Sequence, residues 1–368
     1  MIPFFNLRLA TGELRGLLDA AVARVLDGGR YVGGEEVEAF ESEYAAYCGT
    51  RHAVGTGSGF DALALMLKAF GIGPGDEVIV PAHTFIATWL AVSAAGARPV
   101  PVEPDALTYN LDPERVEAAI TPCTRAVLAV HLYGQRANMA ALSEICRRRG
   151  IWLLADAAQA HGVSAAGAEA SAYSFYPVKN LGAMGDGGAV VTNNSEIARK
   201  VRMLGNYGSR EKYVHEIPGA NSRLDPVQAA ILRVKLAVLD EWNDRRRALA
   251  RQYLEELSGL AGLVLPYVTP GSETVWHLFA IRHRERTRLA QALERSGIET
   301  LIHYPWPPHL SGAYRDAGFR RGDFPVSEHI ADTVLSLPLH PHLTGAQAEE
   351  VIGAIRQALA FAANGGRR

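Results

Sequence analysis

Short apolar runs alternate with amphipathic segments between residues 58 and 205 of the chain. The apolar runs have the length of buried strands. They are Val78–Val80, Arg98–Val102, Ala126–Val130, Trp152–Ala155 and Gly188–Thr192. The segments between them have the period of helices, and the clearest are Ser58–Phe70, Met139–Arg149 and Ser195–Leu204. This alternation predicts an α/β fold with a mainly parallel sheet covered by helices.

The pattern changes after residue 225, where a long helix-like segment runs from Pro226 to Leu257. A chain of 368 residues exceeds the usual size of one domain, so two domains are expected. We predict that this segment joins a large α/β domain with an N-terminal arm, residues 1–240, to a small C-terminal α+β domain, residues 241–368.

Composition narrows the possible classes of function. The formal net charge of −2 provides no broad basic field for nucleic acid. Cys48, Cys123 and Cys146 are scattered without a CxxC pair, so neither a disulfide framework nor a metal site is expected. No secretory signal or bilayer-spanning run is apparent, and the expectation is a cytoplasmic protein with no membrane partner.

One lysine stands out because the chain otherwise uses arginine for its cations. The only lysines are Lys68, Lys179, Lys200, Lys212 and Lys235. Lys179 follows an aromatic, hydroxyl-lined strand and precedes a glycine-rich turn, within Ser174–Thr192. Unlike arginine, a lysine can lose its proton and form a Schiff base. The alternative is an ordinary surface lysine in a glycine-rich loop.

An aspartate upstream gives this lysine a chemical context. Asp156 follows the buried strand Ile151–Ala155, and strand ends are where open α/β sheets bind ligands. Asp156 could instead cap the next helix. Together with Lys179, however, it meets the needs of pyridoxal phosphate, a Schiff-base lysine and a carboxylate that keeps the pyridine nitrogen protonated. Gln159, three residues on, could donate a hydrogen bond to the ring oxygen of the cofactor.

Motifs along the whole chain resemble those of one family. They are IPFFNL, GTGSGFDALALML, PGDEVIVPAHTFIATWLAV, VHLYGQ, ADAAQAHG, SFYPVKNLG, GDGGAVVT, NYGS, NSRLDPVQAAIL, VWHLF, HYPWP and LSLPLHPHL. In this order they resemble the DegT/DnrJ/EryC1/StrS sugar aminotransferases, pyridoxal 5'-phosphate enzymes of the aspartate-aminotransferase-like fold type I. The similarity is greatest to members that aminate nucleotide-linked 3-oxo-6-deoxyhexoses at C3.

The segment GTGSGFDALALML has the features of an anion site. Glycines and Ser58 precede an apolar helix, so free N–H groups and the positive end of the helix dipole face one point. The resemblance implies that the cofactor phosphate binds Ser58 and Gly59, with help from Ser174. Phe60 stands where the family commonly has threonine, so one hydroxyl contact is absent.

The resemblance also implies roles for residues farther along the chain. Phe85 would stack on the pyridine ring, and Asn221 would reach the phosphate from a neighbouring subunit, which implies a homodimer with two shared sites. Around the sugar and its pyrophosphate the implied residues are Tyr176, Lys212 of the other subunit, His303 and Tyr304. The segment 162–173 is shorter than usual in the family, which leaves substrate and dimer contacts there open.

The function implied is transfer of an amino group from L-glutamate to a dTDP-linked 3-oxo-6-deoxyhexose, with Lys179 moving the proton and Asp156 holding the pyridinium. A 4-oxo-sugar or cyclitol aminotransferase of the same family is an alternative. A cofactor-bound regulator without turnover is another. A dehydratase is disfavoured, because relatives with that chemistry carry histidine in place of the lysine.

Overall fold

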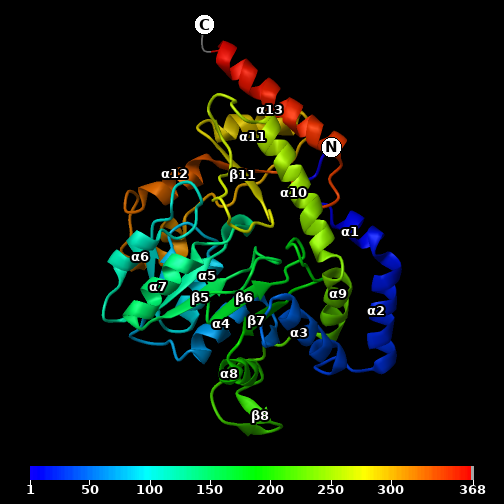
Figure 1. Cartoon of the computed structure of the whole chain (residues 1–368), viewed down its shortest axis with the longest axis vertical. Helices are drawn as coiled ribbons and strands as arrows, with labels where there is room; N and C mark the ends of the chain where they lie inside the picture. The colour runs from blue at the N-terminus through cyan, green and yellow to red at the C-terminus, as the bar shows by residue number, and fades with distance from the viewer. Residues whose placement is uncertain (366–368) are drawn as a thin grey trace.

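A seven-stranded sheet forms the middle layer of the larger part of the molecule, in a computed structural model that describes residues 1–365 (Figure 1). The strand order is β1-β7-β6-β5-β4-β2-β3. Strands β2 to β6 run parallel, whereas β7 is antiparallel to both β6 and β1. The strands are β1 (His52–Thr56), β2 (Glu77–Pro81), β3 (Arg98–Val102), β4 (Thr124–Val130), β5 (Trp152–Asp156), β6 (Ala170–Ser174) and β7 (Gly188–Thr192). The predicted α/β fold class is confirmed.

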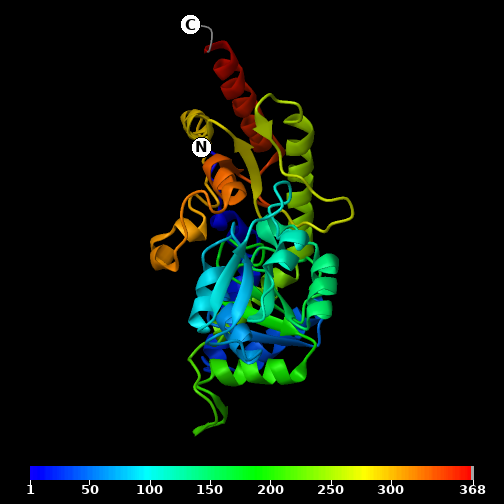
Figure 2. The ribbon, with the colours of Figure 1, turned by 90° about the vertical axis from the view of Figure 1, so that its left-hand side faces the viewer.

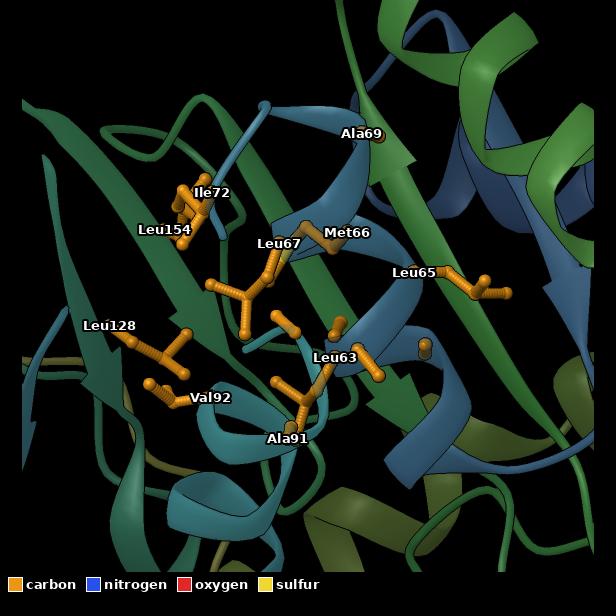
Figure 3. Close-up of a cluster of buried hydrophobic side chains, with 14 of the residues drawn as sticks. Leu63, Leu65, Met66, Leu67, Ala69, Ile72, Ala91, Val92, Leu128 and Leu154 are labelled. Atoms are coloured by element: carbon orange, nitrogen blue, oxygen red, sulfur yellow. The ribbon is translucent and has the colours of Figure 1, made fainter. Parts of the chain in front are cut away.

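Helices cover both faces of this sheet because successive strand residues point to opposite sides. On one side Leu128 and Leu154 belong to one hydrophobic cluster with Leu63 of α4 and Val92 of α5, and Leu128 lies beside Val92 (Figure 3). Their neighbours in the strands belong to a second cluster with residues of α6 and α7. The covering helices are α3 (Glu35–Tyr47), α4 (Gly59–Ala69), α5 (Ala87–Ala94), α6 (Pro113–Ala119), α7 (Met139–Arg149) and α8 (Ser195–Gly205).

A smaller antiparallel sheet lies in the C-terminal part of the chain, in the order β10-β11-β12. It has a hydrophobic cluster of its own, which includes Tyr253, Phe279 and Val351. The elements here are β10 (Leu263–Val264), β11 (Phe279–His283), β12 (Val334–Leu337), α11 (Arg286–Arg295), α12 (Pro325–Thr333) and α13 (Gly345–Gly365), with 3₁₀ turns η2 (Pro308–Leu310) and η3 (Gly312–Ala317).

The long helical segment between the two sheets is two helices rather than one. Helix α9 (Pro226–Leu236) ends before Val238, which has φ −116° and ψ 5°, and α10 (Leu239–Glu256) begins after it. Apolar residues of α9 pack against the large sheet, whereas those in the second half of α10 pack in the C-terminal cluster. Because of the break at Val238, α9 packs against the large sheet while the second half of α10 packs in the C-terminal hydrophobic cluster.

The N-terminal residues contact both parts of the molecule. Ile2 forms a β-bridge with Ile298 and packs in the C-terminal cluster. Helix α1 (Leu7–Glu13) then leads to α2 (Arg15–Gly28), which packs along α9. A hairpin of β8 (Ser209–Glu211) and β9 (Val214–His215) extends away from the rest below α8 (Figure 2).

The three cysteines of the chain are free thiols. Within residues 1–365 no helix has the length and apolar content needed to cross a bilayer. The described side chains form no cluster of three or more His, Cys, Asp or Glu that could hold a metal ion.

Candidate active site

A cavity of about 330 Å³ opens at the carboxyl edge of the parallel strands. The last residues of β4, β5 and β6, which are Val130, Asp156 and Ser174, all line it. This is the edge where open α/β sheets bind ligands. The predicted site residues that line it are Ser58, Gly59, Phe85, Asp156, Gln159, Ser174, Tyr176, Lys179, His303 and Tyr304. The cavity therefore unites residues that lie far apart in the chain.

Asp156 is a buried carboxylate with two hydrogen-bond donors. Its Oδ2 accepts from the Thr88 hydroxyl at 2.8 Å, and its Oδ1 accepts from the Ala158 N–H at 3.1 Å. Burial raises the pKa of Asp156, and the two hydrogen bonds and the charge of Lys179 act in the opposite direction. The donors fix the orientation of the carboxylate, which leaves it able to accept from a protonated ring nitrogen.

Lys179 follows β6 in a turn that ties its backbone down. The Lys179 N–H donates to the Tyr176 carbonyl at 2.8 Å. The next residue, Asn180, donates through Nδ2 to Asn243 Oδ1 at 2.8 Å and to the Val275 carbonyl at 3.0 Å. Burial lowers the pKa of the Lys179 amine to about 8, with Asp156 opposing this shift. A substantial fraction of the amine is therefore neutral near pH 8, as a nucleophile or general base requires.

Asp156 and Lys179 line the same cavity, yet no salt bridge joins them among the described residues. A buried carboxylate and a half-buried lysine that line one cavity without a salt bridge leave room there for another group. Pyridoxal phosphate needs an amine for its aldehyde and a carboxylate for its ring nitrogen. The two side chains fit that cofactor.

The start of α4 fits the phosphate. Ser58 caps the helix, with its Oγ accepting from the Asp61 N–H at 3.1 Å. Gly59 packs so closely on β6 that an added Cβ would lie 2.4 Å from the Ser174 Cβ. The first N–H groups of a helix have no acceptor within it, so this end presents donors to an anion. Phe60, which replaces the usual threonine, also lines the cavity.

Gln159 and two aromatic side chains form the wall beside Asp156. Gln159 Oε1 accepts from the Tyr133 N–H at 2.6 Å, and its Nε2 donates to the Tyr304 hydroxyl at 2.9 Å. The rings of Tyr304 and Phe85 are 5.4 Å apart. Phe85 remains 52% exposed, so one face is free to stack on a planar ring. Gln159 keeps a second Nε2 hydrogen for a ring oxygen.

The two remaining cavity residues predicted for the sugar are His303 and Tyr176. His303 Nδ1 lies 2.9 Å from the Ser336 hydroxyl, and burial lowers its pKa to about 4. The imidazole is therefore neutral at physiological pH and able both to donate and to accept. Tyr176 is exposed at the rim.

Two predicted residues, Lys212 and Asn221, do not line the cavity. Lys212 is exposed at the turn between β8 and β9, with its ammonium 5.1 Å from the centre of the Tyr213 ring. Asn221 is exposed and pairs with Asn206 in a β-bridge. The short segment 162–173 does not line the cavity either; its Ser164 N–H donates to Glu273 at 2.7 Å.

Sequence reasoning missed Thr88 and His277. Thr88 lies three residues after Phe85, but Phe85 precedes helix α5, and no local spacing points from Thr88 to Asp156. His277 comes from the motif VWHLF, lines the cavity and is 3% exposed. Its Nδ1 lies 3.1 Å from Asn180 Oδ1. Because Asn180 uses its Nδ2 as a donor, this oxygen accepts and His277 Nδ1 carries the proton.

Comparison with protein families and solved structures shows which known proteins this chain resembles. Residues 14–356 match the profile of the DegT/DnrJ/EryC1/StrS aminotransferase family. A dTDP-3-amino-3,4,6-trideoxy-alpha-D-glucose transaminase of Streptomyces venezuelae is 57% identical over 97% of this chain and 96% of its own. The crystal structure of S. venezuelae DesV in complex with ketimine intermediate has a TM-score of 0.96 at 56% identity, over 97% of this chain and 98% of that one. The crystal structure of NtdA from Bacillus subtilis with bound cofactor PMP has a TM-score of 0.92 at 32% identity. The match covers 98% of this chain and 85% of the NtdA chain.

Proposed function

The chain belongs to the DegT/DnrJ/EryC1/StrS aminotransferase family, and from that premise we propose that it transfers the amino group of L-glutamate to C3 of a dTDP-linked 3-oxo-6-deoxyhexose. The chain is a pyridoxal phosphate-dependent aminotransferase. The donor, the position aminated and the assembly are the parts that we propose.

The single observation that carries the proposal is the cavity in which Lys179 and Asp156 face the same space without pairing. When bound there, the cofactor supplies an electron sink and stores the amino group between the two half-reactions. Lys179 would hold the cofactor covalently and then, as a free amine, carry a proton to and from the reacting carbon. A pKa near 8 suits an amine that must give and take a proton near neutral pH.

The other cavity residues bind and orient. Asp156, fixed by Thr88, would keep the ring nitrogen protonated. The start of α4 and Ser174 would hold the phosphate, and Phe85 would fix the plane of the ring. His303, Tyr304 and Tyr176 line the same cavity and would bind the hydroxyl and carbonyl oxygens of a sugar.

The substrate proposal rests on similarity and on the chemistry of the cavity. The S. venezuelae relative is named for an amine at C3 of a dTDP-linked trideoxyglucose. Aromatic and apolar side chains, including Phe5, Phe60 and Phe85, supply much of the cavity wall. Such a wall suits a deoxysugar, which has fewer hydroxyls to satisfy than a full hexose.

We further propose a homodimer with shared sites, located in the cytoplasm. Lys212 and Asn221 are exposed on segments away from their own cavity, so they are free to reach that of a second copy.

We also propose that the chain divides into two domains at about residue 240, close to the start of α10. The small antiparallel sheet on the C-terminal side supports it.

Three experiments test the function. Borohydride reduction of the holoenzyme followed by peptide mapping should label Lys179, and label on another lysine would overturn the assigned chemistry. Assays with glutamate and either 3-oxo or 4-oxo dTDP-sugars should show turnover of the 3-oxo compound. Turnover of only the 4-oxo compound would favour a 4-aminotransferase. Failure of glutamate to convert the bound cofactor into its amine form would favour a regulator.

A further inference from the structure

A second cavity, of about 230 Å³, lies on the other side of the Lys179 segment. Its wall combines the start of the chain with residues of α9, α10 and the segment after β12. Phe5, Val178 and Lys179 line both cavities, so the two adjoin at the lysine. Nothing in the proposed reaction uses this second cavity.

Arg246 of α10 brings a buried charge to this cavity. The residue is 4% exposed, and its Nη1 donates to the Leu339 carbonyl at 2.9 Å. Its Nε has no hydrogen-bond partner among the side chains and backbone that the structure describes. Among the described residues no carboxylate lies within salt-bridge distance of the guanidinium, and burial lowers its pKa to about 9. The guanidinium therefore lacks a counter-charge within the described protein.

Lys235 of α9 brings a second buried cation to the same cavity. It is 6% exposed, and its Nζ donates to the Gly182 carbonyl at 2.6 Å. Burial is the cause that lowers its pKa to about 8, and in the described part of the chain no acidic side chain pairs with it. His340, which is 4% exposed and also lines the cavity, has no partner at either ring nitrogen within that same part.

Glu13, an acidic residue that contacts Trp242 and His342 of the cavity wall, already pairs with another arginine. Glu13 accepts from Arg245 at 2.8 Å, lies 2.6 Å from His342 Nε2, and also accepts from the indole of Trp242. It therefore balances Arg245 rather than Arg246. Isolated buried charges are costly, and proteins retain them where a counter-charge or ligand is present. Two such cations at one cavity need an anion that the described chain does not provide.

We propose that this cavity binds a small anion, a carboxylate or an inorganic oxyanion, between Arg246 and Lys235. A guanidinium and an ammonium match the charge and the acceptor oxygens of either ligand. Leu7 and Met184, which line the cavity and are 45% and 43% exposed, mark its opening to solvent. The site is separate from the phosphate-binding start of α4, so it does not depend on the proposed amino acceptor.

The test measures the thermal unfolding of the holoenzyme, because bound cofactor occupies the α4 site and keeps added phosphate from it. Sodium acetate and sodium phosphate are the probes, with a bulky sulfonate buffer salt at the same ionic strength as reference. A ligand at 100 times its Kd should raise the midpoint by about 3–4 °C over that reference. Comparison of the two probes distinguishes a carboxylate site from an inorganic oxyanion site.

Matched variants test whether the anion-dependent rise in the unfolding midpoint comes from binding in this cavity. Arg246→Gln and Lys235→Gln should each lose most of the anion-dependent rise. Arg245→Gln should keep it, because this neighbouring arginine pairs with Glu13 and Glu241. If Arg246→Gln does not fold, the loss or retention of the anion-dependent rise in Lys235→Gln decides whether the site exists. An equal rise in all four proteins, or no rise in the wild type with either probe, would overturn the proposal. Crystals grown in bromide provide a direct check, with an anomalous peak expected beside Arg246.

Discussion

The hydroxyl of Thr88 donates to Oδ2 of Asp156 over 2.8 Å, in a pair where both side chains are buried. A helix that follows β2 thus orients a carboxylate at the end of β5. Because Ala158 occupies the other oxygen, neither oxygen of Asp156 depends on Lys179 for a partner. This arrangement leaves Lys179 free to react and makes the two residues separable by mutation.

Replacement of Asp156 by asparagine should slow transamination by about 100-fold or more with cofactor still bound, because an uncharged amide does not stabilise a protonated ring nitrogen. Thr88→Val should cost less, up to about 10-fold, since it removes one hydrogen bond and leaves the charge. Single-turnover kinetics with glutamate give both rates. A larger loss in Thr88→Val than in Asp156→Asn would contradict the assigned order of roles.

Lys179→Ala should abolish turnover and the imine absorption of the holoenzyme while circular dichroism remains that of the wild type. The hydrogen bond that Lys179 donates to Tyr176 comes from its backbone N–H, which alanine retains, so the fold should not depend on the side chain. Lys200→Ala, at a surface lysine paired with Glu196, is the matched control and should remain active. Normal transamination by Lys179→Ala is incompatible with the mechanism.

The reactivity of Lys179 in the cofactor-free protein should rise with pH about a midpoint near 8, because only the neutral amine reacts and burial lowers its pKa to about that value. Asp156 favours the charged amine, so Asp156→Asn should move the midpoint to lower pH. Competitive acetylation followed by mass spectrometry measures both, with a surface lysine peptide as the internal reference. A midpoint that moves upward in the variant would reverse the assumed sign.

Gly59→Ala should weaken cofactor binding and lower stability by about 1–3 kcal/mol, because the new Cβ would lie 2.4 Å from the Ser174 Cβ and 2.9 Å from its Cα. Gly16→Ala is the control, since no atom lies within 4 Å of a Cβ built there. It should be neutral or slightly stabilising in helix α2. Thermal melts and cofactor titrations of the two variants check this, and equal behaviour would show that the close approach does not matter.

Shared sites predict complementation between inactive variants. If Asn221 serves the partner's cavity, a mixed dimer of Lys179→Ala and Asn221→Ala subunits has one site with both defects and one with none. Random reassociation of equal amounts should then restore about a quarter of wild-type activity, since half of the dimers are mixed. If Asn221 serves its own subunit, every site is defective and no activity returns.

Features of this fold that depend on neighbouring residues can be predicted from the sequence, whereas features that depend on tertiary packing cannot. Helix α7 begins and ends as predicted because Asn138 caps it and the left-handed Gly150 terminates it. The break between α9 and α10 has no Gly or Pro to announce it, since it arises from packing against two different cores.

The same distinction holds for the site. Asp156 and Lys179 are recognisable because their residue types and strand-end positions suit one cofactor. Thr88 and His277 act through partners distant in the chain, Asp156 and Asn180, so their contribution depends on tertiary contacts that no local pattern encodes.

The placement of the first residues has a practical consequence for recombinant production. Ile2 lies in the C-terminal core, the Phe4 N–H donates to Glu299, and Phe5 touches both cavities. Met1 itself is 98% exposed, so a purification tag fused ahead of it extends into solvent. Trimming even a few residues from this end, a routine step when expression is optimised, would instead remove part of the wall around the reactive lysine.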